Sequence, residues 1–421
     1  MFRKIWKWVL MGMAAPLARA IYRRYRPNVI AITGSVGKTT TKEAVYQVLK
    51  PYFDVAKTPG SQNTEWGALI TLIYPGYQAY FYNSKGQAVM SVPKLLLAIL
   101  RGFGSLFVTL KYPKNLVLEL GVDKPGDMEF FNSLMKYDIA VVTKVGESHM
   151  EFFKTYDKLF AEKTNIFNGL KETGLAIVGS EKTDLRDYAR KLVVRHMSVG
   201  TESGDEIRVV RSERQKNAPN YFEIFADGEK FEFNNLLFGR HLDLVFGIAV
   251  AIGLEYSLTV SQITEALSLM KFSDRRFDVT KLSNGAFLVD DSYNASFDSM
   301  KLAIEGLEDV ANGKKVLVLG DMKELGEQST DSHLRVGKVA ATADYLFTVG
   351  ELGRVITEGA IKAGMKKENV TSLPDLKNMD EVNSLADAII KKISNNDVVL
   401  VKASRSTALD RVANSIKTKI G

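Results

Sequence analysis

The chain has 421 residues, which is enough for two or three domains. It has no cysteine, which excludes disulfides, thiolate zinc sites, iron–sulfur clusters and cysteine nucleophiles, and four histidines argue against a multi-histidine metal cage. The formal net charge is +7, but residues 1–27 hold seven basic residues and no acidic one, so the rest of the chain is neutral. This balance argues against a nucleic-acid partner, because nucleic-acid-binding domains carry a basic face.

The first predicted element is an apolar segment with basic flanks, residues 5–22. It is shorter than the ~20 apolar residues that a membrane-spanning helix needs, and Lys7 and Pro16 interrupt it. A basic start before an apolar stretch also resembles a secretory signal, but a nucleotide loop begins just beyond it. Two interpretations stay open: a helix packed on the body of the protein, or a helix on an anionic membrane surface with Trp6 and Trp8 as its contacts.

A glycine-containing loop follows the first predicted strand. Residues 28–33 are apolar and predict a buried strand, and residues 40–50 predict a helix. The loop between them reads Gly34-Ser35-Val36-Gly37-Lys38-Thr39-Thr40. Its backbone N–H groups and the start of the helix can bind phosphate, Lys38 can neutralise phosphate charge, and Thr39 can offer a hydroxyl to Mg²⁺. The loop therefore predicts binding of a nucleotide with Mg²⁺.

A second apolar segment, residues 91–110, has Arg101 at its centre. A charge at the middle of a bilayer is costly, so a membrane span is not favoured. The segment instead predicts a core helix or a helix at an interface.

The remainder of the first unit alternates apolar strands with helical stretches, which is typical of a parallel sheet with helices on both faces. Its further strands are predicted at residues 115–121, 138–146 and 175–180. Residues 205–238 differ and predict antiparallel strands with Asp227-Gly228 as a hairpin turn, in a small β-rich lobe. Residues 243–270 return to helix.

A second α/β unit begins near residue 275 and repeats the alternation of strands and helices. Its strands are predicted within residues 285–292, 314–321, 343–350 and 397–404. The predicted fold is thus α/β, with a P-loop central domain over residues 28–273 and a Rossmann-like C-terminal domain over residues 274–421. Residues 1–27 form a basic, apolar helix that precedes both domains.

The short phosphate loop resembles the ATP loop of the Mur ligase family, enzymes that join an amine to a carboxylate in peptidoglycan-precursor synthesis. The resemblance covers about residues 28–415 and is greatest to the members that add D-alanyl-D-alanine. Besides the loop, it includes Thr58-Pro59-Gly60 with Asn63 and Gly67, Glu119-Leu120-Gly121, Gly146 with His149, Glu162-Lys163, Asp290-Asp291-Ser292-Tyr293-Asn294-Ala295, Leu319-Gly320-Asp321-Met322 with Glu324-Leu325-Gly326, and Lys402-Ala403-Ser404-Arg405.

This resemblance implies catalytic and metal-binding roles beside the loop. Thr39, Glu119 and His149 would bind Mg²⁺, and Lys163 would become a further ligand after its amine has reacted with CO₂ to form a carbamate. Lys38 would act on the phosphates of ATP during catalysis. Without the resemblance, Glu119 reads as a capping or salt-bridge residue, and His149 and Lys163 read as exposed surface residues.

The same resemblance assigns residues to ATP and substrates on the far side of the cleft. Arg276 would contact phosphate, Asp291 the ribose, and Asn294 the nucleotide, so that ATP lies between the domains. A guanidinium can bind the carboxylate of an incoming amino acid through two hydrogen bonds. The residues expected at the substrates are Asn63, Lys402, Ser404 and Arg405.

Two departures from the family pattern affect recognition. Leu242 and Val245 stand where the family has asparagines near adenine, and His241 is retained, so recognition of the base is open. The segment before the phosphate loop is too short for the N-terminal domain that holds the UDP group in the D-alanyl-D-alanine-adding members.

We therefore predict an ATP-dependent, ADP-forming ligase that adds an amino acid or dipeptide, D-alanyl-D-alanine first, to a peptidoglycan precursor through an acyl phosphate. One alternative keeps this chemistry with a lipid-linked or non-peptidoglycan acid, and another is a non-catalytic, membrane-associated nucleotide-binding protein. The expected location is cytoplasmic, with a peripheral contact to the inner face of the membrane through residues 1–27. The sequence leaves the oligomeric state open.

Overall fold

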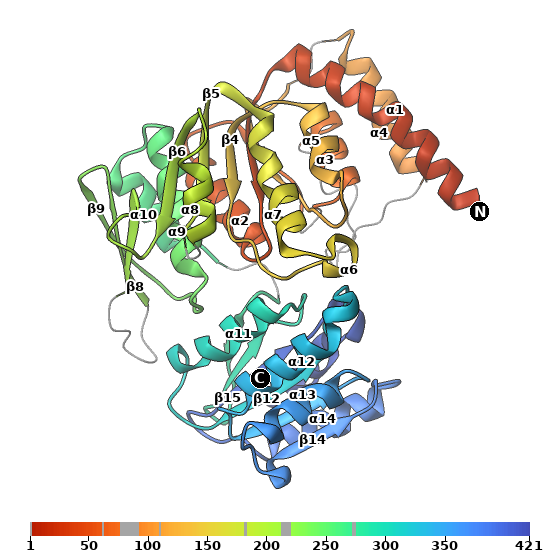
Figure 1. Ribbon diagram of the computed structural model, residues 1–421, viewed down its shortest axis with the longest axis vertical. Coiled ribbons are helices and arrows are strands. Elements are labelled where there is room, and N and C mark those ends of the chain that lie inside the picture. Colours follow the sequence, from red (N-terminus) through yellow and green to blue (C-terminus); the bar gives the residue numbers. More distant parts are fainter. Residues whose placement is uncertain are drawn as a thin grey trace.

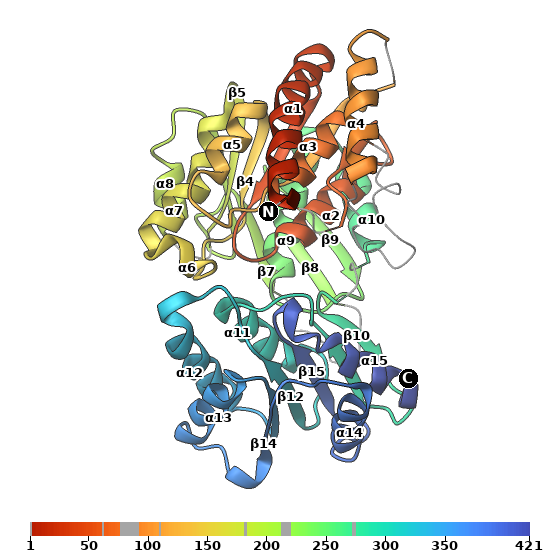
Figure 2. The same cartoon turned by 90° about the vertical axis from the view of Figure 1, so that its right-hand side faces the viewer.

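The computed structural model consists of two α/β units, each built on its own sheet, with one unit above the other in Figures 1 and 2. The structure describes residues 2–60, 63–75, 92–108, 111–180, 183–211, 220–271 and 275–421. The predicted boundary between residues 273 and 274 lies outside these residues. On either side of it, the last helix of the first unit ends at Ser268 and the first strand of the second begins at Asp278.

The first unit contains a nine-stranded sheet in the order β2-β3-β1-β4-β5-β6-β7-β8-β9. Strands β1 to β6 pair in parallel with one another, as predicted for this part of the chain. Their bounds are β1 Asn28–Thr33, β2 Val55–Lys57, β3 Asn115–Glu119, β4 Tyr137–Val142, β5 Leu170–Gly179, β6 Arg195–Gly200, β7 Ile207–Arg211, β8 Asn220–Ala226 and β9 Glu229–Asn235.

Helices cover both faces of this sheet, so a hydrophobic core lies on each face. Alternate residues of β1 point into one core or the other. Val29 and Ala31 pack with one set of helices, whereas Ile30 and Ile32 pack with the other. This explains why the strand reads as a continuous apolar run in the sequence. The helices are α1 Phe2–Tyr25, α2 Lys38–Leu49, α3 Glu65–Ile73, α4 Val92–Ser105, α5 Asp127–Leu134, α6 Met150–Phe153, α7 Tyr156–Thr164, α8 Thr183–Ala189, α9 Leu242–Glu255 and α10 Val260–Ser268.

The strands predicted for a β-rich lobe extend the main sheet instead of forming a separate one. β7 runs parallel to β6 and antiparallel to β8, so the change of direction occurs within a single sheet. β8 and β9 form the predicted hairpin, with Asp227 and Gly228 at φ values of 50° and 78°. Positive φ at both turn positions matches the twist of the flanking strands.

The second unit contains a six-stranded sheet in the order β10-β11-β15-β12-β13-β14, in which only β10 pairs antiparallel. The four predicted strands correspond to β11, β12, β13 and β15, and helices lie on both faces as expected. The bounds are β10 Asp278–Lys281, β11 Phe287–Asp290, β12 Lys315–Gly320, β13 Tyr345–Val349, β14 Val370–Leu373, β15 Val398–Lys402, α11 Phe297–Gly306, α12 Ser329–Ala340, α13 Gly353–Lys362, α14 Met379–Ile390 and α15 Asp410–Ile420.

The N-terminal segment forms the helix α1, which continues through Pro16. Leu10, Ala18 and Ile21 are buried in the first core, where α1 contacts α3, α4 and α5. This part of α1 is therefore a packed helix, one of the two interpretations of the sequence. The side chains of Trp6 and Trp8, on which the membrane interpretation depended, lie outside the description. Among the described residues, no helix is both long enough and apolar enough to cross a bilayer.

Candidate active site in the cleft between the domains

The phosphate loop joins β1 to α2 at the carboxyl edge of the sheet, where α/β proteins place their ligands. Gly34 has φ +143° and Gly37 has φ +86°, values that side-chain-bearing residues rarely adopt. A Cβ at Gly34 would overlap the Thr143 hydroxyl, which itself donates to Val36 O at 2.7 Å. Ser35 N donates to Lys144 O at 2.6 Å. The segment directly after β4 therefore fixes the loop's shape.

Lys38 begins α2, and its amine folds back onto the loop. Its Nζ donates to Gly34 O at 2.5 Å and to Ser35 O at 3.4 Å. Burial lowers its pKa, while the nearby Glu119 carboxylate acts in the opposite direction. A partly buried cation over a phosphate-binding loop is suited to neutralise the outer phosphates of a nucleotide.

Thr39 and Glu119 meet at the ends of α2 and β3. The Thr39 hydroxyl donates to Glu119 Oε1 at 2.9 Å, and Thr58 Oγ1 accepts from Glu119 N at 2.9 Å. On the protein side, Lys42 Nζ lies 3.3 Å from Glu119 Oε2 and also donates to Gly60 O. Both Lys42 and Glu119 are buried. The predicted pair of oxygen ligands is thus brought together, with an internal cation behind the carboxylate.

Lys163, near the end of α7, is buried rather than exposed, contrary to what its position on a helix suggests by itself. Its Nζ lies 3.4 Å from Gly34 O, the same carbonyl that Lys38 contacts. Burial, reinforced by the positive charge of Lys38, lowers the pKa of Lys163 to about 7. The amine therefore loses its proton at a lower pH than the amine of an ordinary lysine does.

His149 is held between carboxylates from both domains. It precedes α6 with φ +58°, and its Nδ1 lies 2.8 Å from Glu324 Oε2 of the C-terminal domain. Its Nε2 lies 3.5 Å from Asp123 Oδ1. The contact with His149 lowers the pKa of Glu324. Since Glu151 N also donates to Glu324 O at 3.3 Å, the two domains contact each other beside the predicted ligand.

Arg276 extends from the C-terminal domain to the phosphate loop. Its Nη2 donates to Thr39 Oγ1 at 3.2 Å, and its guanidinium stacks over the Tyr293 ring at 4.0 Å. Arg405 lies over the same ring at 5.6 Å but is exposed. The aromatic ring therefore positions one arginine beside the loop and a second one nearer solvent.

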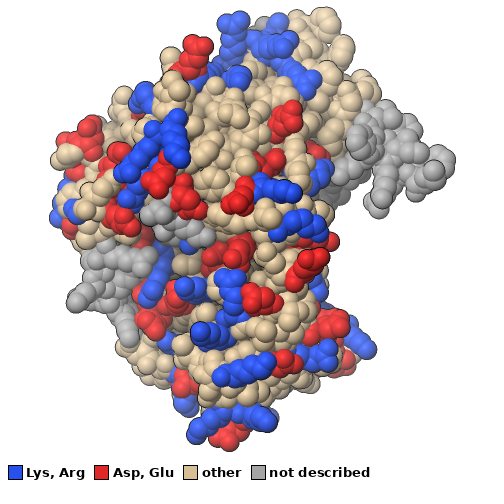
Figure 3. Space-filling view, viewed as in Figure 1, with Lys and Arg blue, Asp and Glu red and all other residues tan. Residues whose placement is uncertain are grey.

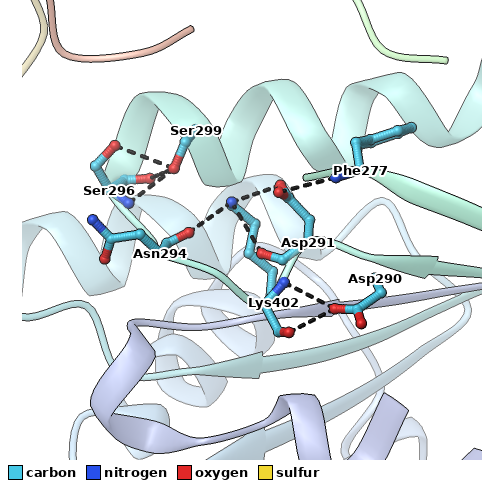
Figure 4. Close-up of polar contacts among 8 residues, drawn as sticks. Phe277, Asp290, Asp291, Asn294, Ser296, Ser299 and Lys402 are labelled. Carbon is cyan, nitrogen blue, oxygen red and sulfur yellow. Dashed lines mark hydrogen bonds and ion pairs between the residues drawn. The ribbon is translucent and has the colours of Figure 1, made fainter. Parts of the chain in front are cut away.

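Lys402 and Asp291 form the central pair of the C-terminal side of the site (Figure 4). Lys402 Nζ donates to Asp291 Oδ2 at 2.6 Å and to Asn294 O at 2.9 Å, and burial lowers the Lys402 pKa. Asp291 Oδ1 also accepts from Phe277 N at 3.2 Å. Ser404, buried nearby, accepts from Lys323 N at 2.9 Å. These bonds hold the strand ends of β11 and β15 in a fixed arrangement.

A cleft of about 580 Å³ between the domains brings most of the predicted residues together. Gly34 and Lys163 do not line it, although Lys163 contacts Gly34 beneath the loop. Leu242 and Val245 are buried in the central core, so they are not available to contact adenine, whereas His241 does line the cleft. The predicted residues in its lining are Ser35, Val36, Gly37, Lys38, Thr39, Thr40, Asn63, Glu119, His149, Arg276, Asp291, Asn294, Lys402, Ser404 and Arg405.

Three charged residues in or under the cleft were not singled out from the sequence. Asp123 faces His149, and its negative charge acts to raise the pKa of Lys38 and of Lys163. Lys42 is paired with Glu119, and Glu324 with His149. Asp123 lies just after the Glu119-Leu120-Gly121 run and Glu324 lies in a quoted motif, so position alone could have suggested both. The role of Lys42 could not be recognised from the sequence, because a lysine in the first turns of a helix is normally exposed to solvent.

The donor set is suited to Mg²⁺. Hydroxyl and carboxylate oxygens are the ligands that this ion prefers, and Thr39 and Glu119 already place two of them side by side. Among the described residues, no cluster of three or more histidine or acidic side chains could hold a metal by itself. Further coordination would have to come from the nucleotide, from water and from a modified lysine.

Comparison with known proteins identifies two domains of one family. Residues 32–252 match the Mur ligase middle domain, and residues 275–405 match the Mur ligase glutamate ligase domain. UDP-N-acetylmuramoyl-tripeptide--D-alanyl-D-alanine ligase of Bacillus subtilis is 30% identical, covering 95% of this chain and 78% of the relative. The protein of the same name in Escherichia coli is 25% identical, with 95% and 79% covered.

The fold comparison agrees with the sequence comparison. The crystal structure of MurF ligase from Thermotoga maritima in complex with ADP is 26% identical, with a TM-score of 0.78. The match covers 97% of this chain and 84% of that chain. The chain therefore belongs to the Mur ligase family of ATP- and Mg²⁺-dependent, ADP-forming ligases.

Proposed function

We propose that this Mur ligase adds D-alanyl-D-alanine to a UDP-linked muramoyl tripeptide. The names of the curated relatives support the substrates, since several carry that activity over more than nine-tenths of this chain. The single observation that carries the proposal is the cleft itself. It joins the phosphate loop, Glu119 and His149 from one domain to Arg276, Lys402 and Arg405 from the other. We also propose the domain division at residues 27/28 and 273/274.

The reaction needs an activated carboxylate. A carboxylate oxygen of the acid attacks the γ-phosphorus of ATP, which forms an acyl phosphate and releases ADP. The amine then attacks the acyl carbon, loses a proton, and expels phosphate through a tetrahedral intermediate. The loop N–H groups and Lys38 would hold the β- and γ-phosphates, and Arg276 would lie beside them next to Thr39.

Mg²⁺ would neutralise phosphate charge during transfer, with Thr39, Glu119, His149 and a carbamylated Lys163 as its protein ligands. The burial of Lys163 supports this modification, because CO₂ reacts only with an uncharged amine. The new N–C bond forms as the nitrogen loses a proton, which turns the neutral amine into an anion. The positive charge of Lys38, which disfavours a cation at Lys163, would favour that anion.

For the amine substrate, Arg405 is the side chain best suited to bind a carboxylate. It is exposed in the cleft, while Lys402 is buried and already paired with Asp291. We propose that Lys402 and Ser404 shape the wall that carries Arg405, and that Asn63 faces the acid. The substrates and ATP make the cytoplasm the proposed location.

The test measures ADP release with UDP-N-acetylmuramoyl-tripeptide and D-alanyl-D-alanine, omitting each in turn, and identifies the product by mass. We expect turnover only when both are present. The Glu119→Gln variant should lose activity, whereas Glu129→Gln, which changes an exposed glutamate on α5, should retain it.

Tight ATP binding without turnover would contradict the proposed acid and favour a lipid-linked or unrelated acid. ATP binding and ADP release that are equal in the wild type and Glu119→Gln would contradict the assigned site. No turnover with any acid would favour the non-catalytic alternative.

A further inference from the structure

Helix α4 presents a continuous apolar surface to solvent. Leu100, Phe103 and Phe107 are 68%, 56% and 77% exposed, and Leu96, Leu97 and Val108 are exposed beside them. Leu96, Leu100, Phe103 and Phe107 follow one another at spacings of four, three and four residues, so they share one face of α4 and the turn after it. Such a contiguous patch of large side chains is uncommon on a free surface.

The opposite face of α4 fixes the helix firmly to the central domain. Leu95, Ala98 and Ile99 are buried in the first core. A Cβ at Gly102 would clash with Ile73 of α3 and approach Leu17 of α1 within 3.1 Å, so the three helices are closely packed. The exposed apolar face is therefore not an unpacked core face. It is a second apolar side of a helix that already has its core contacts.

Positive charge surrounds this surface, and negative charge is absent from the segments that build it. Residues 1–42 and 66–118 contain no aspartate or glutamate. Arg101, exposed on α4, lies over the Tyr74 ring at 4.9 Å, and Lys111 is exposed beyond the turn. Tyr25 at the end of α1 donates to Ser105 O at 3.0 Å and stacks on Tyr112 at 4.5 Å. These contacts bring the exposed arginines of the α1 end, Arg23, Arg24 and Arg26, close to the end of α4.

The α4 surface lies away from the active site, so a partner bound to it would leave the active site accessible. The C-terminal domain lies at one end of the central domain, and α1 and α4 lie toward the other end in both views (Figures 1 and 2). The cleft is lined by residues of both domains, so it lies at the end where they meet. Lys and Arg side chains gather at the upper end of the molecule, where α1 ends (Figure 3). A contact there would not cover the cleft or hinder movement of the C-terminal domain.

We propose that the α4 surface, residues 96–108 with the basic end of α1, docks on an anionic lipid bilayer. Leu100, Phe103 and Phe107 would enter the boundary between headgroups and acyl chains, and the flanking arginines and lysines would pair with lipid phosphates. A second copy of this chain is less suited, because pairing two such surfaces would bring like charges together without an acidic partner. The inference does not depend on the substrates proposed above.

Vesicle flotation of the full chain tests the proposal, with vesicles of phosphatidylcholine alone and of phosphatidylcholine mixed with phosphatidylglycerol. We expect binding to the anionic vesicles only, and weaker binding at high salt. Leu100→Glu/Phe103→Glu should reduce the partition coefficient more than about tenfold. The matched control is Leu236→Glu/Leu269→Glu, which changes residues that are 73% and 65% exposed away from α4 and should leave binding unchanged.

Circular dichroism and ATP binding would show that each variant is folded. The proposal is overturned if the wild type does not float with anionic vesicles, or if it floats equally with neutral ones. Unchanged flotation of the α4 variant would assign membrane binding elsewhere and overturn the role of α4. A change of sedimentation coefficient in the α4 variant, without any vesicle binding by the wild type, would identify a second copy as the occupant.

Discussion

At the scale of single residues, buried lysines distinguish this site. Lys38, Lys42, Lys163 and Lys402 all have buried or largely buried amines around one cleft. Each needs a specific counter-charge or must lose its proton, since burial disfavours the charged form. Lys42 and Lys402 have carboxylate partners, Glu119 and Asp291, whereas Lys163 is placed next to another cation. Lys163 is therefore the group most prone to react as a neutral amine.

Lys163→Met should abolish ligase activity and remove a carbamate signal. In wild-type protein supplied with ¹³C-bicarbonate, we expect one carbamate resonance by NMR, which weakens as the pH falls below about 7 because the amine becomes protonated. Lys158→Met, which changes an exposed lysine on the same helix, should retain the resonance and the activity. A resonance that survives in Lys163→Met would show that another amine is modified.

The free energy of unfolding should also reveal the neutral Lys163. Its pKa is lowered in the folded state from the ordinary lysine value of 10.5 to about 7, so the unfolded chain binds more protons between these pH values. In CO₂-free buffer, stability should rise with pH over this window, by at most about 1.4 kcal/mol per pH unit for one group. Denaturant titrations of Lys163→Met should show a shallower rise. An identical pH dependence in both proteins would contradict the lowered pKa.

Lys42→Met should destabilise the protein through Glu119. Removing one partner of a buried ion pair leaves the other charge without compensation, at a cost of about 3–5 kcal/mol. We expect the urea midpoint to fall and ATP binding to weaken, because Glu119 would no longer be held beside Thr39. Lys50→Met, at an exposed position after α2, is the control. If the variant is as stable as the wild type, the Lys42–Glu119 pair makes no net contribution to the free energy of unfolding.

At the scale of elements, local patterns predicted most strands in the middle of each sheet, but they missed β6, whose first half is only partly buried. β1, β3 and β4 read as apolar runs because helices cover both of their faces. The short edge strands β2, β10 and β14 were not predicted, since three or four partly buried residues leave no periodic signal. The join of β7 to the parallel sheet depends on pairing with β6, which sequence alone does not encode locally.

Gly34→Ala tests the phosphate loop as an element. The substitution adds a methyl group that overlaps the Thr143 hydroxyl and forces a strained φ of +143°. ATP affinity should fall more than about tenfold by isothermal titration, with some loss of stability. Gly228→Ala at the hairpin also has positive φ but nothing within 4 Å of the added Cβ, so it should alter stability only. Unchanged ATP affinity in Gly34→Ala would contradict the loop's assigned role.

At the scale of the whole molecule, the two domains meet through a few charged contacts around the cleft. Besides the His149–Glu324 contact, Arg335 lies 2.6 Å from Glu147 and stacks over Phe297 at 3.8 Å. Surface ion pairs of this kind contribute about 0–1 kcal/mol. Contacts this weak permit the domains to separate when nucleotide leaves.

Arg335→Met should therefore leave the free energy of unfolding within about 1 kcal/mol of the wild type. It should weaken closure, so that small-angle scattering with an ATP analogue shows a larger radius of gyration than for the wild type. A variant as compact as the wild type with the analogue bound would show that the nucleotide alone closes the cleft.

The site is built from residues of two domains, and this limits how much of it could be predicted from the sequence. The phosphate loop carries its own local signal, and resemblance to the family supplied Glu119, His149, Lys163 and Arg276. Burial of Lys163 and the pairing of Lys402 with Asp291 depend on contacts between residues more than a hundred positions apart. The Lys42–Glu119 pair joins residues 77 positions apart, and no local pattern in the sequence predicted it.

The most direct test of the central claim follows the oxygen atoms of the acid. UDP-N-acetylmuramoyl-tripeptide labelled with ¹⁸O in its reacting carboxyl group is incubated with ATP, Mg²⁺ and D-alanyl-D-alanine, and the released phosphate is analysed by mass. An acyl phosphate intermediate predicts one ¹⁸O atom in the phosphate for each amide formed, with ADP as the other product. Unlabelled phosphate, or release of AMP and pyrophosphate, would contradict the account.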